Sequence, residues 1–249
     1  MSVVLPLVGA LVVLAVAQDV FSTVLFPASG HGVIRKPLSR AVWGVFAALA
    51  GRSHGERRRN LLAYAGPVQI VTTIGVWFLL LVVGWACIYQ PALGAAITAS
   101  KGPTDTGFAT ALYVSGYAVT TLGTGDVVAQ TGSYRLLMVL EAASGFITFT
   151  MVISYFLSVY SQLPSRNAFA QALHDKTGGS GEAAALIVGL TDGEDLGRLP
   201  QELSEMASFL RHTAQTHRSY PVLRSFHYRQ EFYALPQVLL VCLDTASVL

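Results

Sequence analysis

A short stretch of the chain, residues 118–126, combines two glycines with hydroxyl residues at a spacing that could coordinate a cation. Gly123 and Gly125 alternate with residues whose side chains can point away from a common axis. Glycine adopts left-handed dihedrals at no steric cost, so the backbone here can turn every carbonyl oxygen to one side. Four copies around an axis would stack rings of carbonyl oxygens, which can replace the hydration shell of a cation.

Two apolar segments flank this stretch, and residues 68–160 as a whole resemble the pore domain of the potassium channel family. Residues 111–120 are similar to the family's pore helix. Residues 121–126 (the filter segment) read Thr-Leu-Gly-Thr-Gly-Asp where the family carries Thr-Val-Gly-Tyr-Gly-Asp. Gly145 falls at the inner-helix hinge position without a gap. A nucleotide-binding turn is the other common use of Gly-x-Gly, but no strand precedes this one.

The resemblance implies a set of ion ligands. The ion-binding residues would be Thr121, Leu122, Gly123, Thr124 and Gly125, with potassium held by the first four. Each chain holds a single filter segment, so four chains are needed to close a pore. Thr104, Asp105 and Thr106 are candidate N-caps for the pore helix, which runs through Tyr117. The partly negative C-terminus of that helix would favour a dehydrated cation in the cavity.

The filter departs from the family at its aromatic position. Thr124 replaces the aromatic residue between the two glycines, and Val114 replaces one of the pore-helix aromatics that brace it in the family. Permeation depends on backbone oxygens and should survive, whereas tight discrimination of potassium from sodium becomes less certain. The residues expected to support the filter are Asp126, Tyr117 and Glu141. Glu141 either braces the filter through Tyr117 or a water, or faces a hydroxyl of a neighbouring subunit.

The segment after the filter predicts a gate. Helical spacing below Gly145 places Phe149, Ile153, Ser154 and Leu157 towards one face. In the family the corresponding face lines the cavity and the inner gate. An apolar constriction at Ile153 or Leu157 could close the pore by dewetting, although Ser154 could equally serve helix packing.

The composition is that of a membrane protein with a polar appendix. Apolar residues make up 53% of the chain and charged residues 12%, against roughly a quarter charged in soluble domains. Three stretches can span a bilayer, at residues 3–26, 67–89 and 134–160. The two cysteines, Cys87 and Cys242, suggest no disulfide framework and are expected to be small buried residues.

The first span has two features that need interpretation. A signal peptide is the competing interpretation, but no basic residue precedes the apolar run, so we favour a retained helix. Asp19 is costly at membrane depth. Either it has a functional role, or it lies near the interface and reaches water or bonds Ser22 or Thr23; we favour the second.

Residues 27–65 carry seven lysines and arginines against Glu56 alone, which predicts a cytoplasmic loop. Within this loop, residues 38–49 are apolar but too short to span, as expected for an interfacial helix. The run of arginines at 57–59 could bind anionic lipid, although a topology anchor is the simpler role. Residues 90–132 are poor in basic residues and should face outward.

The C-terminal region is predicted to be helical and cytosolic. Residues 166–175 continue the inner helix, and the glycines of 178–181 break it as a flexible linker. Residues 200–217 form an amphipathic helix, with its apolar stripe at Leu203, Met206, Ala207, Leu210 and Ala214. His212 and His217 are expected to be surface histidines, not a metal site. Residues 235–249 form an apolar helix. Either the natural chain continues beyond it, or four such chain ends pack together.

These observations predict an all-α membrane protein with an outer helix, a re-entrant pore helix and filter, and an inner helix. An N-terminal transmembrane helix (1–27), a basic loop (28–65) and a helical cytosolic region (162–249) flank the pore domain (66–161). The expected function is a homotetrameric potassium channel of the plasma membrane, with the N-terminus outside and the C-terminus cytoplasmic. The alternatives are a weakly selective potassium and sodium channel, and a non-conducting membrane sensor or scaffold. We expect membrane lipid as a partner, and no enzyme activity, cofactor, nucleic acid or voltage sensor.

Overall fold

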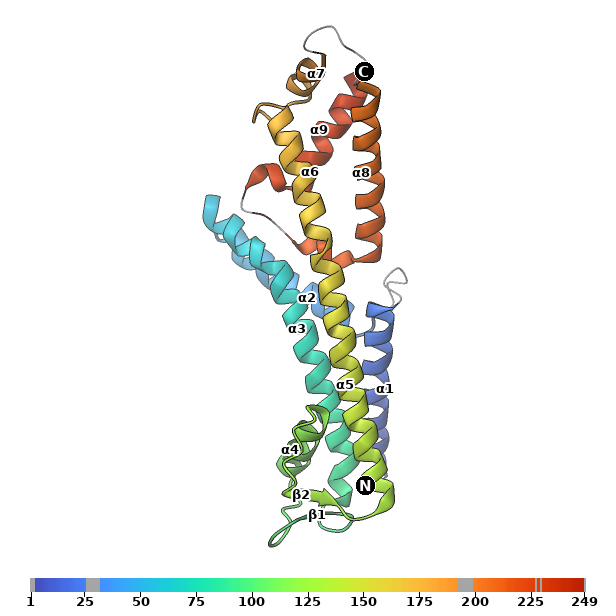
Figure 1. Cartoon of the computed structure of the whole chain (residues 1–249). Coiled ribbons are helices and arrows are strands. Elements are labelled where there is room, and N and C mark those ends of the chain that lie inside the picture. The colour runs from blue at the N-terminus through green and yellow to red at the C-terminus, as the bar shows by residue number, and fades with distance from the viewer. Residues whose placement is uncertain (1–2, 26–31, 192–198, 227, 229, 249) are drawn as a thin grey trace. The chain divides into compact units, whose positions relative to one another are not determined.

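The computed structural model describes residues 3–25, 32–191, 199–226, 228 and 230–248 (Figure 1). The described elements are almost entirely helical, as expected for an all-α membrane protein. Contacts divide the chain into one unit formed by Met1–Ser39 and Val71–Tyr155 and a second formed by Arg40–Ile70 and Phe156–Leu249. The span end expected at Phe26 and the chain end at Leu249 lie outside the described residues.

Three described helices are long and apolar enough to cross a membrane, as the sequence predicted. They are α1 (Val4–Val24), α3 (Gly55–Tyr89) and α5 (Gly132–Tyr160). The helix that contains the span expected at residues 67–89 already begins at Gly55, so the end of the expected basic loop is helical. Glu56 in its first turn complements the helix dipole, and the residues that follow are mostly good helix formers.

In the first unit, α1 packs against α3 through two glycines. A Cβ on Gly9 would lie 2.3 Å from the carbonyl oxygen of Gly84, so both positions require the absence of a side chain. Farther along, Asp19 of α1 meets Trp77 of α3, so the two helices run antiparallel. In Figure 1 the start of α1 accordingly lies at the same end of this unit as the two short strands.

Asp19 is a buried structural residue. It is 1% exposed, its Oδ2 accepts a 2.8 Å bond from Trp77 Nε1, and its Oδ1 accepts a 2.9 Å bond from the Ile34 amide. The expectation that it reaches water or bonds Ser22 or Thr23 is therefore wrong. The Ser22 hydroxyl donates to the backbone carbonyl of Asp19, not to its carboxylate. The packing of α1 on α3, which local sequence does not reveal, supplies the carboxylate with its partners.

The pore helix, α4 (Phe108–Val119), belongs to the same core as α1, α3 and the start of the second strand. Before it, a 3₁₀ turn η2 (Gln90–Ala92) leads to β1 (Ile97–Ala99), and after it comes β2 (Val127–Ala129). The strands pair antiparallel, with Ile97 opposite Ala129 and Ala99 opposite Val127. These two strands were not predicted from the sequence.

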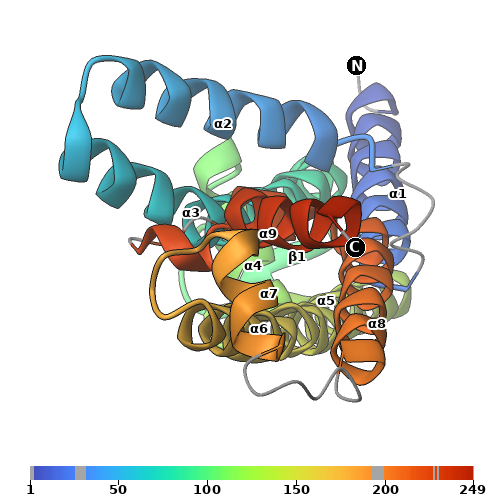
Figure 2. The ribbon, with the colours of Figure 1, turned by 90° about the horizontal axis from the view of Figure 1, so that it is seen from above.

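In the second unit, α2 (Arg35–Gly51) and the beginning of α3 lie side by side as a helical hairpin (Figure 2). The helix expected at residues 38–49 is thus present. The described C-terminal helices are α6 (Gln162–Lys176), α7 (Ala183–Thr191), α8 (Leu199–Ser219) and α9 (Leu235–Val248). Two 3₁₀ turns, η4 (Pro221–Ser225) and η5 (Glu231–Tyr233), connect the last two.

The C-terminal helices share a small apolar core. Phe169 of α6 stacks on Phe209 of α8 with ring centroids 3.7 Å apart. The buried residues of α8 are Met206, Phe209 and Thr213, while Ala214 is exposed, so the expected apolar stripe was wrong at that position. Gly178, Gly179 and Gly181 have positive φ and end α6 where the linker was expected. Cys87 and Cys242 are both buried free thiols, which confirms the expectation for them.

Candidate ion pore

The backbone of the filter segment alternates between left-handed and other dihedrals. The angle φ is +57° at Thr121, +60° at Gly123 and +73° at Gly125, whereas Leu122 and Thr124 have negative φ. Such alternation turns successive peptide units the same way, so that their N–H groups gather on one side and their carbonyls on the other. The two glycines therefore adopt the left-handed dihedrals that the sequence predicted.

Thr121 is the only non-glycine residue with positive φ in the described part of the chain. A left-handed β-branched residue is strained by on the order of 1–3 kcal/mol, so its surroundings must hold it. The Thr121 amide donates to the Ala118 carbonyl at 3.0 Å, and the Leu122 amide donates to the Tyr117 carbonyl at 2.8 Å. These two bonds fix the direction in which the chain leaves α4 and enters the filter segment.

The N-terminus of α4 is organised by Asp105. Its Oδ1 accepts a 2.9 Å bond from the Gly107 amide and its Oδ2 accepts a 2.9 Å bond from the Thr110 hydroxyl. These hydrogen bonds hold the pKa of Asp105 below its usual value, the Gly107 bond contributing most. The N-cap residue itself is Gly107, so the expectation of Thr104, Asp105 or Thr106 in that position was wrong. Asp105 nevertheless satisfies donors of the first turn from two residues upstream.

The outer end of the filter segment is tied to the chain before the pore helix. The Ser100 amide donates to the Asp126 carbonyl at 2.7 Å, and the Ser100 hydroxyl donates to the Gly125 carbonyl at 2.6 Å. The β1–β2 pairing continues this attachment beyond Asp126. Because the carbonyl of Gly125 is engaged with Ser100, the free carbonyls of the segment are those of residues 121–124.

Asp126 connects the filter segment to the pore helix. Its Oδ2 accepts a 2.9 Å bond from the Tyr113 hydroxyl of α4, and its Oδ1 accepts a 2.5 Å bond from the Thr124 hydroxyl. These bonds, the Thr124 bond above all, hold the pKa of Asp126 below its usual value. The resemblance presents Thr124 as the loss of an aromatic brace. In the structure Thr124 has a polar partner in the same chain, the carboxylate of Asp126.

Tyr117 and Glu141 are both buried behind the filter segment, but they do not bond to one another. The Tyr117 hydroxyl donates to the Val127 carbonyl, and Glu141 Oε1 accepts a 2.5 Å bond from the Ser115 hydroxyl. Glu141 is 0% exposed, and the buried Tyr89 lies beside it. Within the chain, Glu141 thus bonds Ser115 and does not bond Tyr117 directly. A brace through water and a contact with a neighbouring subunit's hydroxyl stay predictions.

Gly145 is the point where α5 approaches the end of α4. A Cβ there would lie 2.1 Å from the Val119 carbonyl oxygen, a distance that no real contact permits. The helix runs without interruption from Gly132 to Tyr160, and a hinge at this glycine stays a prediction. Its role in the structure described is close packing that sets where the filter segment begins.

An open-sided hollow of about 490 Å³ lies beside the start of the filter segment. Its wall is formed by Phe78, Val119, Thr120, Thr121, Gly145, Phe146 and Phe149. The predicted gate residues continue along the same helix: Phe149, Ile153 and Leu157 are 54%, 43% and 62% exposed. All three side chains are therefore partly exposed in the single chain, and their role as a gate stays a prediction.

Three residues of this site were missed by sequence reasoning: Ser100, Tyr113 and Ser115. Tyr113 lies one helical turn before Tyr117, and a paired aromatic spacing on the pore helix was the signal that could have revealed it. Ser100 and Ser115 offered no local signal, because their partners lie 25 and 26 residues away in the chain.

Comparisons with known proteins agree with this geometry. Residues 72–162 match the family described as "Ion channel", which covers about half of α3 and all of α4, the filter segment and α5. The chain is also similar to the uncharacterized membrane protein YdjJ of Bacillus subtilis (strain 168), with 29% identity over 227 residues. That match covers 89% of this chain and 62% of the relative, so the chain spans less than two thirds of the relative's length. No solved structure matches the chain.

The family match and the geometry point to the same segment. The matched residues contain the helix before the filter segment, the alternating backbone of the segment and the apolar helix that follows it. The chain is therefore a membrane protein whose residues 72–162 are similar to the ion channel family.

Proposed function

We propose that four copies of this chain form a potassium channel, with the filter segment as its selectivity filter. The observation that carries the proposal is the alternation of positive φ at Thr121, Gly123 and Gly125 in a segment that is exposed throughout residues 121–126. Within one chain these residues have little to pack against, and Leu122 is 72% exposed. A ring of four chains would close around this surface and place the carbonyls on a common axis.

The proposed ligands are the carbonyl oxygens of Thr121, Leu122, Gly123 and Thr124, together with the Thr121 hydroxyl. Gly125 is left out of this set because its carbonyl accepts the Ser100 hydroxyl. Its part is to supply the left-handed dihedral that turns the chain towards Asp126. The C-terminus of α4 ends against the same hollow and would add its partial negative charge to the attraction for a cation.

Potassium is favoured over a mixed potassium and sodium current because the filter segment is held from two sides. Asp126 is bonded to Tyr113 and Thr124, and Ser100 holds the backbone at its outer end. A filter that is held at its larger coordination distance does not collapse around a smaller ion. A weakly selective cation channel is the second candidate, favoured by the missing aromatic ring at Thr124.

A purified chain reconstituted in liposomes tests both conduction and selectivity. Opposed gradients of potassium and sodium should give a reversal potential close to the potassium equilibrium value. A reversal potential near zero with robust current would favour the weakly selective channel. A folded tetramer in the same liposomes without any flux would instead favour a non-conducting sensor or scaffold.

We further propose that the N-terminus lies outside and the C-terminal helices lie in the cytoplasm. The basic residues of α2 and of the start of α3, against the few basic residues between Gln90 and Gly132, support this orientation. The antiparallel packing of α1 on α3 places the start of α1 at the same end as the filter's outer attachment. Cysteines introduced at Ser53 and Ser180 should be labelled from the cytoplasmic side, and labelling of Ser180 from the outside alone would reverse the orientation.

A further inference from the structure

A buried arginine in the second unit has no acidic partner among the residues that the structure describes. Arg166 of α6 is 7% exposed, and its guanidinium makes one long bond, from Nη2 to the Phe226 carbonyl at 3.5 Å. Its Nε has no hydrogen-bond partner, and its Cζ lies 5.0 Å from the centre of the Tyr228 ring. None of the described aspartates or glutamates pairs with it. A buried charge without a counter-charge is costly, so the site is one that an anion would stabilise.

A histidine with a free nitrogen faces the same place. His217 of α8 has its Nδ1 at 3.0 Å from the Thr213 carbonyl, so Nδ1 carries a proton and donates it. The other nitrogen, Nε2, is buried and has no hydrogen-bond partner. Burial, and then the positive charges of Arg166 and Arg224, hold the pKa of His217 below its usual value.

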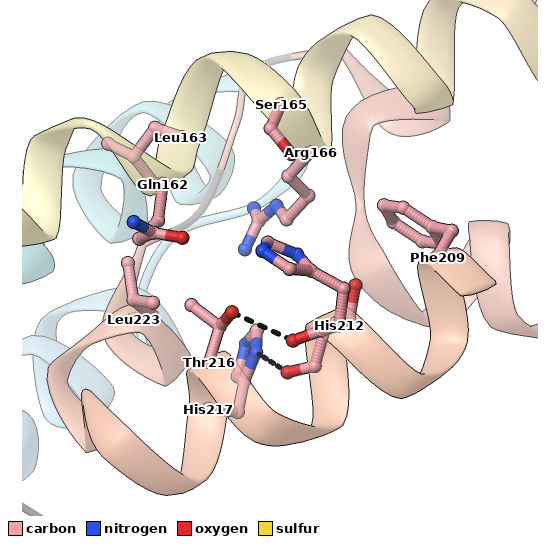
Figure 3. A pocket seen from close by; sticks show the side chains of 10 residues that line it. Gln162, Leu163, Ser165, Arg166, Phe209, His212, Thr216, His217 and Leu223 are labelled. Atoms are coloured by element: carbon pink, nitrogen blue, oxygen red, sulfur yellow. Dashed lines mark hydrogen bonds between the residues drawn. The ribbon is translucent and has the colours of Figure 1, made fainter.

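Both side chains line one pocket between α6, α8 and η4 (Figure 3). Gln162, Ser165 and His212 supply further donors to its wall, and no carboxylate is among the lining residues. The enclosed space is about 10 Å³, which is room for about one water-sized atom. The rim at Ser165 and His212 is exposed, so a larger group can enter by one atom and remain mostly outside.

We propose that this pocket binds a phosphate group, with one oxygen inserted between Arg166 and His217. A phosphate oxygen is water-sized, and the planar guanidinium matches the spacing of two phosphate oxygens. The remaining oxygens lie at the rim, within reach of Gln162, Ser165 and His212. The group can come from a soluble phosphate compound or from a lipid headgroup, which share this chemistry. The proposal does not depend on ion conduction, because all its residues belong to the second unit.

Phosphate binding is coupled to the protonation of His217. The charged and titratable groups around this imidazole are Arg166 of α6, Arg224 of η4 and His212 of α8. Arg166 and Arg224 disfavour a positive charge on His217 when the pocket is empty, whereas a bound phosphate offsets their charge and accepts a bond from Nε2–H. The pKa of His217 therefore rises on binding, so a proton is taken up and the affinity increases as the pH falls.

The test is the thermal stability of the full chain in detergent, titrated with inorganic phosphate at matched ionic strength in chloride. Wild type should show a saturable rise in Tm that is larger at pH 6 than at pH 8. The affinity can change by up to about tenfold per pH unit while one proton is taken up. Arg166→Gln should weaken binding by about tenfold or more, since it removes a charged hydrogen-bond donor. His217→Gln should keep only the pH dependence that comes from the titration of phosphate itself, and Arg211→Gln, at an exposed site on α8, should bind like wild type.

A second measurement uses wild type alone and covers the possibility that Arg166→Gln does not fold. Histidine NMR, with the His217 signal assigned by its loss in His217→Gln, should show the pKa of His217 rising on addition of phosphate. Vesicles of phosphatidylcholine with and without phosphatidylglycerol separate the two sources of the phosphate group. A response only to phosphatidylglycerol assigns the site to a lipid headgroup. The proposal fails if Arg166→Gln, once folded, responds to phosphate and to phosphatidylglycerol as wild type does, or if neither ligand moves the pKa of His217.

Discussion

The Tyr113 hydroxyl donates a 2.9 Å hydrogen bond to Asp126, which joins the middle of the pore helix to the outer end of the filter segment. Thr124 bonds the other oxygen of the same carboxylate. The resemblance to potassium channels presents Thr124 and Val114 as the loss of an aromatic brace. The structure has a polar connection between the same two parts of the chain, made through Asp126.

Tyr113→Phe tests whether this connection holds the filter. The substitution keeps the ring, which lies edge-on to Tyr117 with centroids 5.4 Å apart, and removes only the hydroxyl. We expect the current to inactivate severalfold faster with the tetramer intact, as measured in planar bilayers. Tyr64→Phe, at an exposed tyrosine of α3, is the matched control. Unchanged inactivation in Tyr113→Phe would remove Asp126 from the set of filter supports.

The lowered pKa of Asp126 sets the pH range in which this connection persists. A carboxyl whose pKa is lower in the folded than in the unfolded protein stabilises the fold above its unfolded pKa, and this contribution is lost as the pH falls through the folded value. Conduction should therefore be insensitive to outer pH from about 8 down to about 5. It should decline only under more acidic conditions, and this acid sensitivity should be absent from Asp126→Asn. A steep loss of current near pH 6 that persists in Asp126→Asn would point to another group.

The Glu141–Ser115 bond is expected to stabilise the filter from behind without touching the ions. Ser115→Ala leaves Glu141 Oε1 without its donor in a buried place, at a cost of about 1–3 kcal/mol. Open-state lifetime or inactivation should change in Ser115→Ala and in Glu141→Gln, while the potassium to sodium permeability ratio stays the same. The double substitution should cost less than the sum of the two, because both remove the same contact. An altered permeability ratio in Glu141→Gln would mean that Glu141 faces the ions.

Gly145→Ala distinguishes close packing from a hinge. The new methyl group would overlap the Val119 carbonyl, so α4 or α5 must shift, and stability should fall by about 1–3 kcal/mol. Gly75→Ala is the control, because a Cβ at Gly75 of α3 meets nothing within 4 Å and alanine favours a helix. Tm of the tetramer in detergent measures both. A wild-type Tm in Gly145→Ala, together with altered gating, would restore the hinge interpretation.

The sequence predicted those parts of the pore that depend on local pattern. The three apolar spans follow from hydropathy and the left-handed glycines from the steric freedom of glycine, while α4 was expected from the resemblance to potassium channels. Hydrogen bonds between distant residues did not follow, because a serine such as Ser100 or Ser115 resembles any other until the fold brings its acceptor close. The prediction for the partners of Asp19 failed for the same reason, since Trp77, which bonds its carboxylate, lies 58 residues away in the sequence. The sequence singled out Gly145, but only the folded structure reveals the Val119 carbonyl that lies against it.

The left-handed glycines of the filter segment give the sharpest test of the whole assignment. A Cβ at Gly123 or Gly125 would meet nothing within 4 Å in the chain, so the cost of alanine there is the backbone strain alone. That strain is about 1 kcal/mol or more in each chain, and four chains would share one axis in the proposed channel. Because Thr121 is already strained in the same segment, little tolerance remains for a further forced dihedral.

Gly123→Ala and Gly125→Ala should each abolish selective conduction while the protein remains folded and tetrameric, as measured by reversal potential and by size in detergent. Gly102→Ala is the matched control, because Gly102 also has a positive φ, of +76°, and open space, but lies outside the filter segment. It should carry a similar strain and conduct like wild type. Thr124→Phe restores the aromatic residue that the family carries, yet with Val114 opposite it we expect only a modest gain in potassium preference. The two glycine substitutions are the changes expected to disturb the carbonyls of residues 121–124 most. Potassium-selective current in both variants would therefore show that the ions pass elsewhere.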